Sequence, residues 1–435
     1  MKKTIIKSTF YLILVSVIAK ILSFLVRILL ARSLSADAMN LYSLACPTMV
    51  FIITLAQMGI PGALSKVIAQ KDRSREPLKS CVIISVINNI IISFMFLLLI
   101  PLLAHHILKQ DMMEPVLYAI LPLIPMVTVS GLLKGYLFGI QRHLSATACQ
   151  LFEEGTRIIY LAVVFTLNPS MDVVGASRIA MLSVTIGEIG SSLFMLFSLR
   201  RKFHHGLALT DLFADLHKSS FDEVLSVSIP MTGSRLIGSL TYFLEPILMV
   251  MGLSGIGAAG MVNAYGQLNG YVLPILTMPS FITITLSNFL LPSFTYHYTR
   301  NNHKTAARLF TVIITVCFLI GFLCSLICYR FSSFLMELFY HTQRSAPLLK
   351  TLAWPFAFYA LQPPLASLLH ALSRSRRTVV DTFLGSISRL LCVALLTPIL
   401  HENSLAIGLT VGMMITTLLH AVNVWMALRN RTVSD

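Results

Sequence analysis

The chain has 435 residues, of which 56% are hydrophobic and only 12% are charged, whereas soluble globular domains carry about 25% charged residues. This composition excludes an ordinary soluble domain. The formal net charge of +15 would suit a nucleic-acid-binding protein, but the basic residues lie in short segments between apolar runs, not in one basic domain. We therefore expect an integral membrane protein with no nucleic-acid partner.

Twelve apolar runs reach the length of about 20 residues that an α-helix needs to cross a bilayer. They predict an all-α integral membrane protein with about 12 transmembrane helices. In the eighth run, Gly270, Pro274 and Pro279 predict a kink or a local break. The expected spans are 9–31, 41–64, 81–103, 116–139, 146–167, 177–199, 224–250, 260–291, 307–328, 347–372, 378–399 and 404–428.

The lysine and arginine residues between the spans are distributed unevenly across the membrane. When the N-terminus is placed inside, the inner segments hold 22 of them and the outer segments hold five. Cytoplasmic loops of membrane proteins carry this excess of basic residues. The sequence therefore predicts a multi-pass protein of the plasma membrane whose N- and C-termini both lie in the cytoplasm.

The longest polar stretch, at about residues 200–223, separates two sets of six spans. We expect an N-terminal six-helix bundle at 1–205, a cytoplasmic linker at 206–222 and a C-terminal six-helix bundle at 223–435. Because each set has an even number of spans, both bundles begin on the same side of the membrane.

The two halves also resemble each other in sequence. Gln141-Arg142 is followed fifteen residues later by Arg157, and Ser373-Arg374 is followed fifteen residues later by Arg389, at a common offset of 232. Residues 42–64 resemble residues 265–286 at an offset of about 222, and the ends of spans six and twelve match at about 229. Two parallel six-helix repeats are typical of an alternating-access transporter.

The seventh span carries Arg235 and Glu245 well inside its apolar run. A charge at membrane depth costs roughly 2.5–3.5 kcal/mol on insertion scales, so it usually faces a cavity or a partner. The two residues are about 15 Å apart along a helix axis and do not neutralise each other. We expect Arg235 to bind an anion in a polar cavity. Glu245 is either a coupling carboxylate for a proton or Na⁺, or the partner of a basic residue on another helix.

The first span carries Lys20 and Arg27, which are seven residues apart. Seven residues make almost two helical turns, so both side chains lie on one face, about 10 Å apart. We interpret them as a cationic stripe that faces a central cavity. The alternative for Arg27 is that its long side chain reaches the outer membrane surface.

Spans five and six carry further ionisable side chains. Glu153 and Arg157 have the i,i+4 spacing of a local ion pair, and Glu154 lies beside them. Arg389 is the repeat equivalent of Arg157 but lacks acidic neighbours in its own span. Glu188 has no basic neighbour in its helix, so it is either a proton-coupling residue or a hydrogen-bonded structural one. We keep Arg157, Arg389, Glu153 and Glu154 as secondary site candidates.

Because the acids near Arg157 are used locally, spans one and seven carry a surplus of positive charge. A positive cavity favours an anionic cargo such as a pyrophosphate, since arginine and lysine are the usual partners of phosphate groups.

Nothing in the sequence indicates an enzyme or a metal site. The seven cysteines lie in or beside apolar stretches without a CxxC pair, which favours buried apolar residues over disulfides or metal ligands. Metal-ligand spacings, a phosphate loop, a nucleophile elbow and a catalytic triad are all missing from the sequence. We expect no cofactor, and leave open coupling to H⁺, to Na⁺ or to the membrane potential.

Three segments resemble the stage V sporulation protein B family. They are residues 41–69, which run from Leu-Tyr-Ser-Leu-Ala-Cys-Pro to Met-Gly-Ile-Pro-Gly-Ala-Leu-Ser-Lys-Val-Ile-Ala, Ser-Ala-Thr-Ala-Cys-Gln-Leu-Phe-Glu-Glu-Gly-Thr-Arg at 145–157, and Arg-Leu-Ile-Gly-Ser-Leu-Thr-Tyr-Phe-Leu-Glu-Pro-Ile at 235–247. The resemblance implies the MATE-like exporter superfamily, which also holds the lipid II flippase MurJ and the polysaccharide O-unit flippases. It further implies two six-helix bundles, alternating access, and outward flipping of an undecaprenyl-pyrophosphate-linked sugar whose pyrophosphate Lys20, Arg27 and Arg235 would hold.

The predicted function is therefore a flippase of an undecaprenyl-pyrophosphate-linked saccharide, either a peptidoglycan precursor or a polysaccharide unit. Its expected partners are the lipid-linked saccharide and the bilayer, and we expect a monomer. One alternative is a MATE-type drug or cation antiporter, which would need an acidic or aromatic cavity. The other is a non-transporting membrane scaffold for cell-wall assembly, which would tolerate loss of the buried charges.

Overall fold

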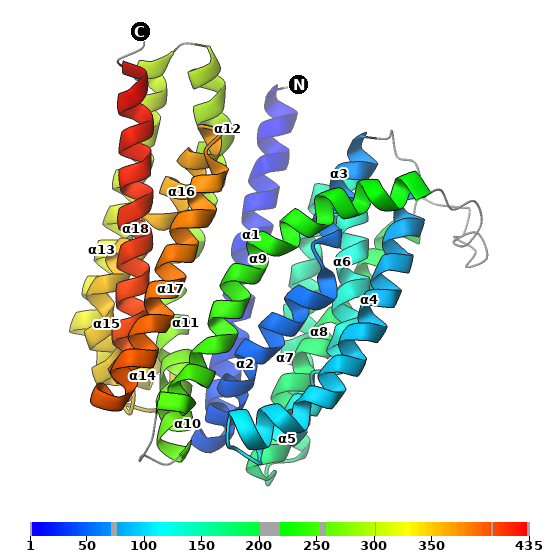
Figure 1. Ribbon diagram of the computed structural model, residues 1–435, viewed down its shortest axis with the longest axis vertical. Coiled ribbons are helices and arrows are strands. Elements are labelled where there is room, and N and C mark those ends of the chain that lie inside the picture. Colours follow the sequence, from blue (N-terminus) through cyan, green and yellow to red (C-terminus); the bar gives the residue numbers. More distant parts are fainter. Residues whose placement is uncertain are drawn as a thin grey trace. The chain divides into compact units, whose positions relative to one another are not determined.

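A computed structural model describes residues 2–70, 76–200, 218–252, 258–300, 302–401 and 403–432 (Figure 1). This part of the chain contains helices and connecting segments, and no β-strand. The first elements are α1 (Lys2–Ser33), α2 (Ala36–Gln57), α3 (Ile60–Gln70), α4 (Glu76–Pro101), the π-helix η1 (Leu102–Ile107), α5 (Met113–Tyr118), α6 (Leu123–Gly139), α7 (His143–Leu167), α8 (Val173–Arg200) and α9 (Lys218–Gly252). The remaining elements are α10 (Ala258–Gly266), the π-helix η3 (Gln267–Val272), α11 (Leu273–Thr277), α12 (Ser280–Thr299), α13 (His303–Arg330), α14 (Ser332–Tyr340), α15 (Ala346–Tyr359), α16 (Gln362–Ala371), α17 (Ser375–Leu400) and α18 (Asn403–Thr432).

Each of the twelve expected spans falls on a helix or on a broken pair of helices. Within the described residues, eight helices are long and apolar enough to cross a membrane, and one bent pair adds a ninth. The other three expected spans are helical as well. Of these, α7 and α9 carry charged residues in the middle, and α15 and α16 divide one span into two short helices. The prediction of an all-α membrane protein is confirmed.

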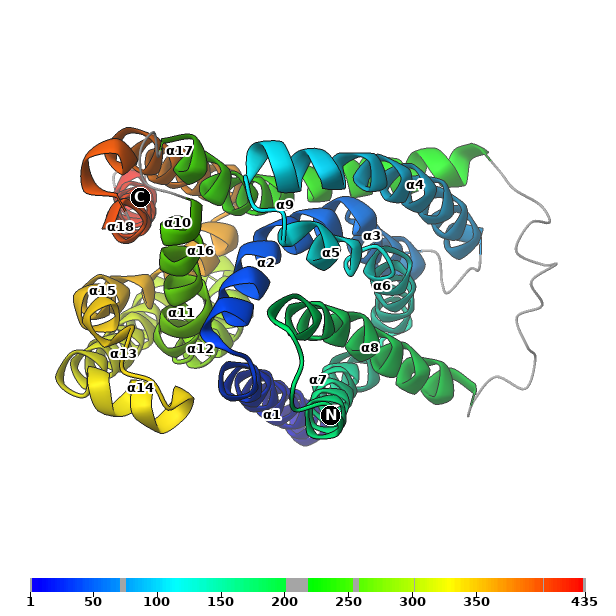
Figure 2. The same cartoon turned by 90° about the horizontal axis from the view of Figure 1, so that it is seen from below.

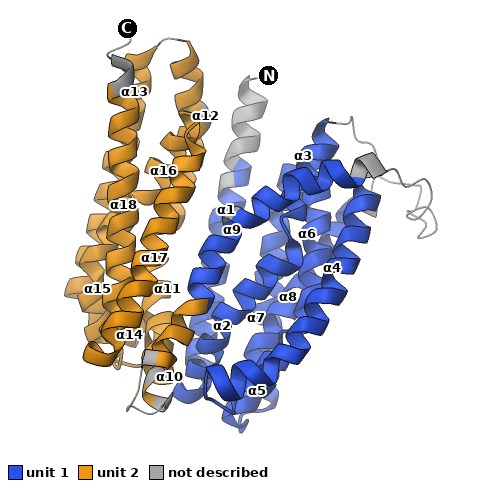
Figure 3. Cartoon of the chain, viewed as in Figure 1, with its two compact units in different colours: residues 1–243 blue, residues 244–435 orange. Residues whose placement is uncertain are grey.

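The chain forms two compact units, residues 1–243 (unit 1) and 244–435 (unit 2), which are coloured separately in Figure 3. The sequence places the boundary at 206–222, of which 206–217 lie outside the described residues. The units instead divide inside α9, because the first part of this helix packs on α3. Val224 is fully buried against Ile60 and Leu64 there.

Unit 1 is built around α6 and α8. Helix α6 packs on α3 and α8, while α7 packs on α8 and on α1. Figure 2 shows α1 and the unit 1 part of α9 on opposite sides of this unit. Helices α1 and α9, which carry the predicted cationic residues, therefore lie on two different sides of unit 1.

The second expected span, 41–64, lies within the membrane span Ala36–Gln70, which is interrupted between α2 and α3. Met58 and Gly59 adopt left-handed backbone conformations, with φ of 45° and 63°. The amide of Asn88 donates to two carbonyl groups in the last turn of α2, at 2.9 and 3.1 Å, and the Ser228 hydroxyl donates to the Met58 carbonyl. Side chains thus satisfy the backbone groups that the break releases, as a membrane interior requires.

Unit 2 confirms the break expected in span eight. The segments Val262–Thr277 and Ser280–Thr299 meet at an angle of 51°, with the π-helix η3 inside the first of them and Pro279 at the joint.

Close packing of α17 on α18 dominates the rest of unit 2. A Cβ atom at Gly412 would lie 2.7 Å from the Gly385 carbonyl oxygen and 2.7 Å from the Arg389 Cβ. Glycine at this crossing therefore lets the two helix backbones approach each other.

The backbone repeats the 232-residue offset seen in the sequence. Gln141 and Ser373 both have left-handed conformations, with φ of 61° and 60°, two residues after the last residue of α6 and of α16. In each case the next amide donates to the carbonyl five residues earlier at 2.8 Å, which forms a Schellman cap. Lys109 and His341, with φ of 51° and 53°, are a second pair at the same offset. The internal repeat is therefore present in the fold of each unit.

Candidate functional site

The basic residues proposed for pyrophosphate binding all lie in unit 1, on α1 and α9. Lys20 and Arg235 have exposed side chains, and Arg235 is the central residue of α9. Neither forms an ion pair with a described acidic side chain. Arg27 is partly buried, with its guanidinium 5.9 Å from the centre of the Tyr42 ring. These residues do not form one cluster within unit 1, because α1 and α9 lie on opposite sides of it (Figure 2).

Arg157 of α7 takes a different acidic partner from the predicted one. Its guanidinium lies 3.2 Å from the carboxylate of Glu154, three residues earlier, and not against Glu153. Residues three and four apart both face Arg157 on a helix, so sequence spacing alone does not choose between the two acids. Glu154 is buried.

Glu188 of α8 is part of a polar cluster inside unit 1. The Ser130 hydroxyl of α6 donates to its carboxylate. Lys134, one turn after Ser130 on α6, interacts electrostatically with Glu153 and Glu188. Lys134 lies within α6 and is partly buried. The four-residue spacing from Ser130 was the signal that could have revealed this polar face of α6.

Glu245 and Arg389 form a two-pronged ion pair inside unit 2. The guanidinium Nε of Arg389 donates to Glu245 Oε1 at 2.8 Å, and the terminal Nη2 donates to Oε2 at 2.5 Å. Glu245 is completely buried, and 18% of the Arg389 side chain is exposed. Arg389 therefore has an acidic partner after all, supplied by α9 and not by its own helix. The arrangement fits the second interpretation of Glu245, an ion pair with another helix.

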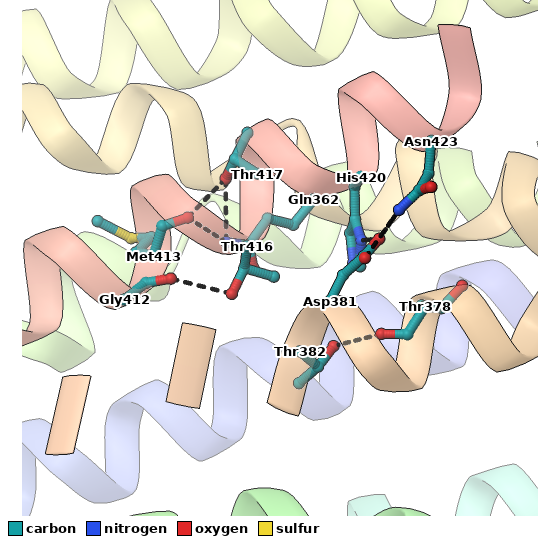
Figure 4. A network of polar contacts seen from close by, with 10 residues as sticks. All are labelled: Gln362, Thr378, Asp381, Thr382, Gly412, Met413, Thr416, Thr417, His420 and Asn423. Carbon is teal, nitrogen blue, oxygen red and sulfur yellow. Dashed lines mark hydrogen bonds and ion pairs between the residues drawn. The ribbon is translucent and has the colours of Figure 1, made fainter. Parts of the chain in front are cut away.

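A second polar network in unit 2 was not predicted. Asp381 of α17 contacts His420 and Asn423 of α18, and all three side chains are buried (Figure 4). One and two turns earlier on α18, the Gln362 amide of α16 donates to the Thr417 hydroxyl and to the Met413 carbonyl, both at 3.0 Å. The three- and four-residue spacing of polar residues along α18 was the available signal.

These side chains provide charges and hydrogen-bonding groups, but they do not assemble a metal centre. Among the described residues, no group of three or more histidine, cysteine, aspartate or glutamate side chains is placed to hold a metal ion. The described residues provide exposed cations on unit 1, at Lys20 and Arg235, and buried carboxylates in both units.

Comparison with known proteins assigns the chain to a family. A family model described as polysaccharide biosynthesis protein matches residues 5–297, about two thirds of the chain. The chain belongs to this family. It is 30% identical over 436 residues to stage V sporulation protein B of Bacillus subtilis (strain 168), an alignment that covers 97% of this chain and 84% of that protein. The resemblance inferred from the three sequence segments is thereby confirmed.

Two solved structures share the fold of this family member. An inward-facing multidrug resistance MATE family transporter of the MOP superfamily matches 94% of this chain and 96% of its own, with a TM-score of 0.73 and 16% identity. The lipid II flippase MurJ in an inward closed conformation matches 94% of this chain and 86% of its own, with a TM-score of 0.73 and 11% identity. At these identities the likeness establishes the fold alone, that of an all-α multi-pass membrane transporter.

Proposed function

We propose that the chain is a flippase that moves an undecaprenyl-pyrophosphate-linked saccharide across the plasma membrane by alternating access. The observation that carries this proposal is family membership. The chain matches the polysaccharide biosynthesis family over most of its length and is 30% identical to stage V sporulation protein B. The cargo would be a peptidoglycan precursor or a polysaccharide unit.

The pattern of charge pairing supports an anionic cargo. The buried acids of both units have partners: Glu154 has Arg157, Glu245 has Arg389, and Asp381 has His420. In contrast, the exposed side chains of Lys20 and Arg235 lie in the middle of helices that we expect to cross the membrane. A cation at membrane depth needs water or an anion beside it. The diphosphate of the carrier lipid would supply that anion in separate steps, to Lys20 and Arg27 on α1 and to Arg235 on α9, because these residues do not form one cluster.

The remaining assignments complete this proposal. Both termini would lie in the cytoplasm, in agreement with the excess of basic residues in the inner segments. The protein would act as a monomer without a cofactor or nucleic-acid partner, and would not be an enzyme. Energy would come from H⁺, Na⁺ or the membrane potential, with Glu188 or Glu245 as the coupling carboxylate. Because Glu245 is already neutralised by Arg389, Glu188 is the better candidate of the two.

The test is rescue of bacteria depleted of their own peptidoglycan-precursor flippases, with delivery of lipid-linked precursor to the outer leaflet as the readout. Wild type is compared with Lys20→Ala, Arg235→Ala and Arg235→Lys at matched expression. Lys304→Ala, which removes an exposed basic side chain at the start of α13, is the matched control. Wild type and the control are expected to rescue. Loss of a charge-assisted contact worth about 1.5–3 kcal/mol should reduce precursor delivery by roughly tenfold or more in the alanine variants.

Each other outcome has a defined meaning. Rescue by Arg235→Ala and Lys20→Ala at wild-type level would show that these residues do not anchor the cargo. If that rescue also occurred without movement of the precursor, it would favour a scaffold function. Failure of a well-expressed wild type, combined with protection against cationic drugs, would overturn the flippase proposal in favour of an antiporter.

A further inference from the structure

The buried contact between α17 and α18 contains an acid and an imidazole that are shielded from solvent. His420 Nδ1 lies 2.8 Å from Asp381 Oδ2, and the Asn423 amide lies 2.8 and 2.9 Å from the two Asp381 oxygens (Figure 4). Asp381 and His420 are each only 2% exposed, and Asn423 is 6% exposed. Asn423 follows His420 by three residues, so both side chains leave α18 on the face that meets Asp381.

In these surroundings, the net charge of the Asp381–His420 pair depends on whether one proton is bound. Asp381 pairs with His420, whereas Arg389 on the same helix is engaged with Glu245. From α16, His370 interacts electrostatically with His420. The titratable side chains of α15 face elsewhere, with Tyr359 interacting with Arg389 and Lys350 lying over the Tyr329 ring.

The donor pattern favours a proton over a metal cation. Both Asp381 oxygens receive hydrogen bonds from nitrogen donors, so the carboxylate has the surroundings of an anion and presents no open oxygen cage. With Nδ1–H donated to Asp381, the free position for a proton is Nε2 of His420. Protonation there gives an imidazolium–carboxylate pair with no net charge, and release of the proton leaves one buried negative charge.

The internal repeat places a second titratable group at the same position of unit 1. His420 corresponds to Glu188 at the offset of 232 residues, and Gln362 corresponds to Ser130. In unit 1, Ser130 of α6 binds Glu188 of α8, and in unit 2, Gln362 of α16 binds α18 one turn before His420. The last helix of each repeat thus carries one protonatable side chain at a buried polar contact.

We propose that Asp381, His420 and Asn423 form a proton-binding site in unit 2, at which His420 gains and loses the proton at Nε2 during the transport cycle. Asp381 and Asn423 are positioning residues that fix the ring. An uncompensated carboxylate in this buried place is costly, so release of the proton favours a state of unit 2 in which water reaches the site. The role in the cycle rests on the proposed transport function, whereas proton binding itself does not.

The first measurement is residue-specific and uses the full chain in lipid nanodiscs. Exchange of the imidazole C2 hydrogen for deuterium, read by mass spectrometry over about pH 5–9, reports the protonation of each histidine separately. His303, exposed at the start of α13, serves as the internal reference. We expect Asp381→Asn to change the pH dependence of the His420 exchange rate, because it removes the carboxylate that faces Nδ1. A His420 that keeps one protonation state throughout, or that ignores Asp381→Asn, would overturn the proposal.

The second measurement asks whether the bound proton matters to the protein. Thermal unfolding of wild type, His420→Gln and the control His303→Gln, at the exposed start of α13, is followed across the same pH range. The pH dependence of the melting temperature should be reduced in His420→Gln and retained in His303→Gln. In the rescue strain, His420→Gln should likewise lose the dependence of precursor delivery on external pH. A wild-type pH profile in His420→Gln would refute the coupling role. Failure of wild type to rescue would overturn the flippase proposal, and the proton site would then be tested by the deuterium-exchange measurement alone.

Discussion

Breaking the pair between Glu245 and Arg389 should destabilise unit 2 strongly. Arg389→Met leaves the completely buried Glu245 carboxylate without its two guanidinium hydrogen bonds. Removing one partner of a buried pair costs about 3–5 kcal/mol. For a unit of this size each kcal/mol shifts the melting temperature by about 2–4 °C, so a decrease of about 6–20 °C is expected. Thermal unfolding of the purified protein, followed by fluorescence-detected size-exclusion chromatography, measures it.

The double variant Glu245→Leu/Arg389→Met separates a structural pair from a functional one. Apolar residues of similar volume often replace a buried ion pair with no loss of stability, so the double variant should melt near wild type. Lys304→Met, at an exposed helix start, controls for the loss of a basic residue. A single variant that melts like wild type would refute the energetic argument. A stable double variant that fails in the rescue assay would instead make the pair part of the transport mechanism.

Three further predictions concern packing and polar contacts. Gly59→Ala should destabilise unit 1 by about 1–3 kcal/mol, because φ is 63° and the new Cβ would lie 2.7 Å from the Ser228 carbonyl oxygen. The control is Gly238→Ala, which should have little effect on the melting temperature because Gly238 has open space around it. Gly412→Ala should lower the melting temperature by separating α17 from α18, and a wild-type value would show that the helices shift freely. Ser130→Ala should lower the free energy of unfolding by about 1.5–3 kcal/mol, because it removes the hydrogen bond to Glu188. Ser226→Ala, on the exposed side of α9, is its control in the same unfolding assay.

The sequence predicted the helical framework well because each membrane span carries its own signal. About 20 apolar residues identify a span wherever it lies, and Pro279 identified the joint in span eight. The break at Met58 and Gly59 was missed because it lies inside a long apolar run. It exists because Asn88 and Ser228, from other helices, bind the released carbonyl groups.

The sequence shows which charged residues lie inside the spans, but it does not identify their partners. Glu245 and Arg389 are 144 residues apart, and only the packing of α9 on α17 brings them together. The choice of Glu154 over Glu153 by Arg157 depends on side-chain conformation, since either spacing is compatible with a helix. His420 was overlooked because a single histidine in an apolar span carries no signal until Asp381 is seen beside it.

The paired left-handed turns show where the two repeats have the same length and where they differ. From Lys109 to Gln141 and from His341 to Ser373 the spacing is identical, so these stretches have equal length in the two halves. The offset near Tyr42 and Tyr265 is about ten residues smaller, so a net insertion or deletion of that size falls between the second span and Lys109 in one half or its equivalent in the other. Left-handed backbone torsions can therefore identify equivalent positions in the two halves where the side chains no longer resemble each other.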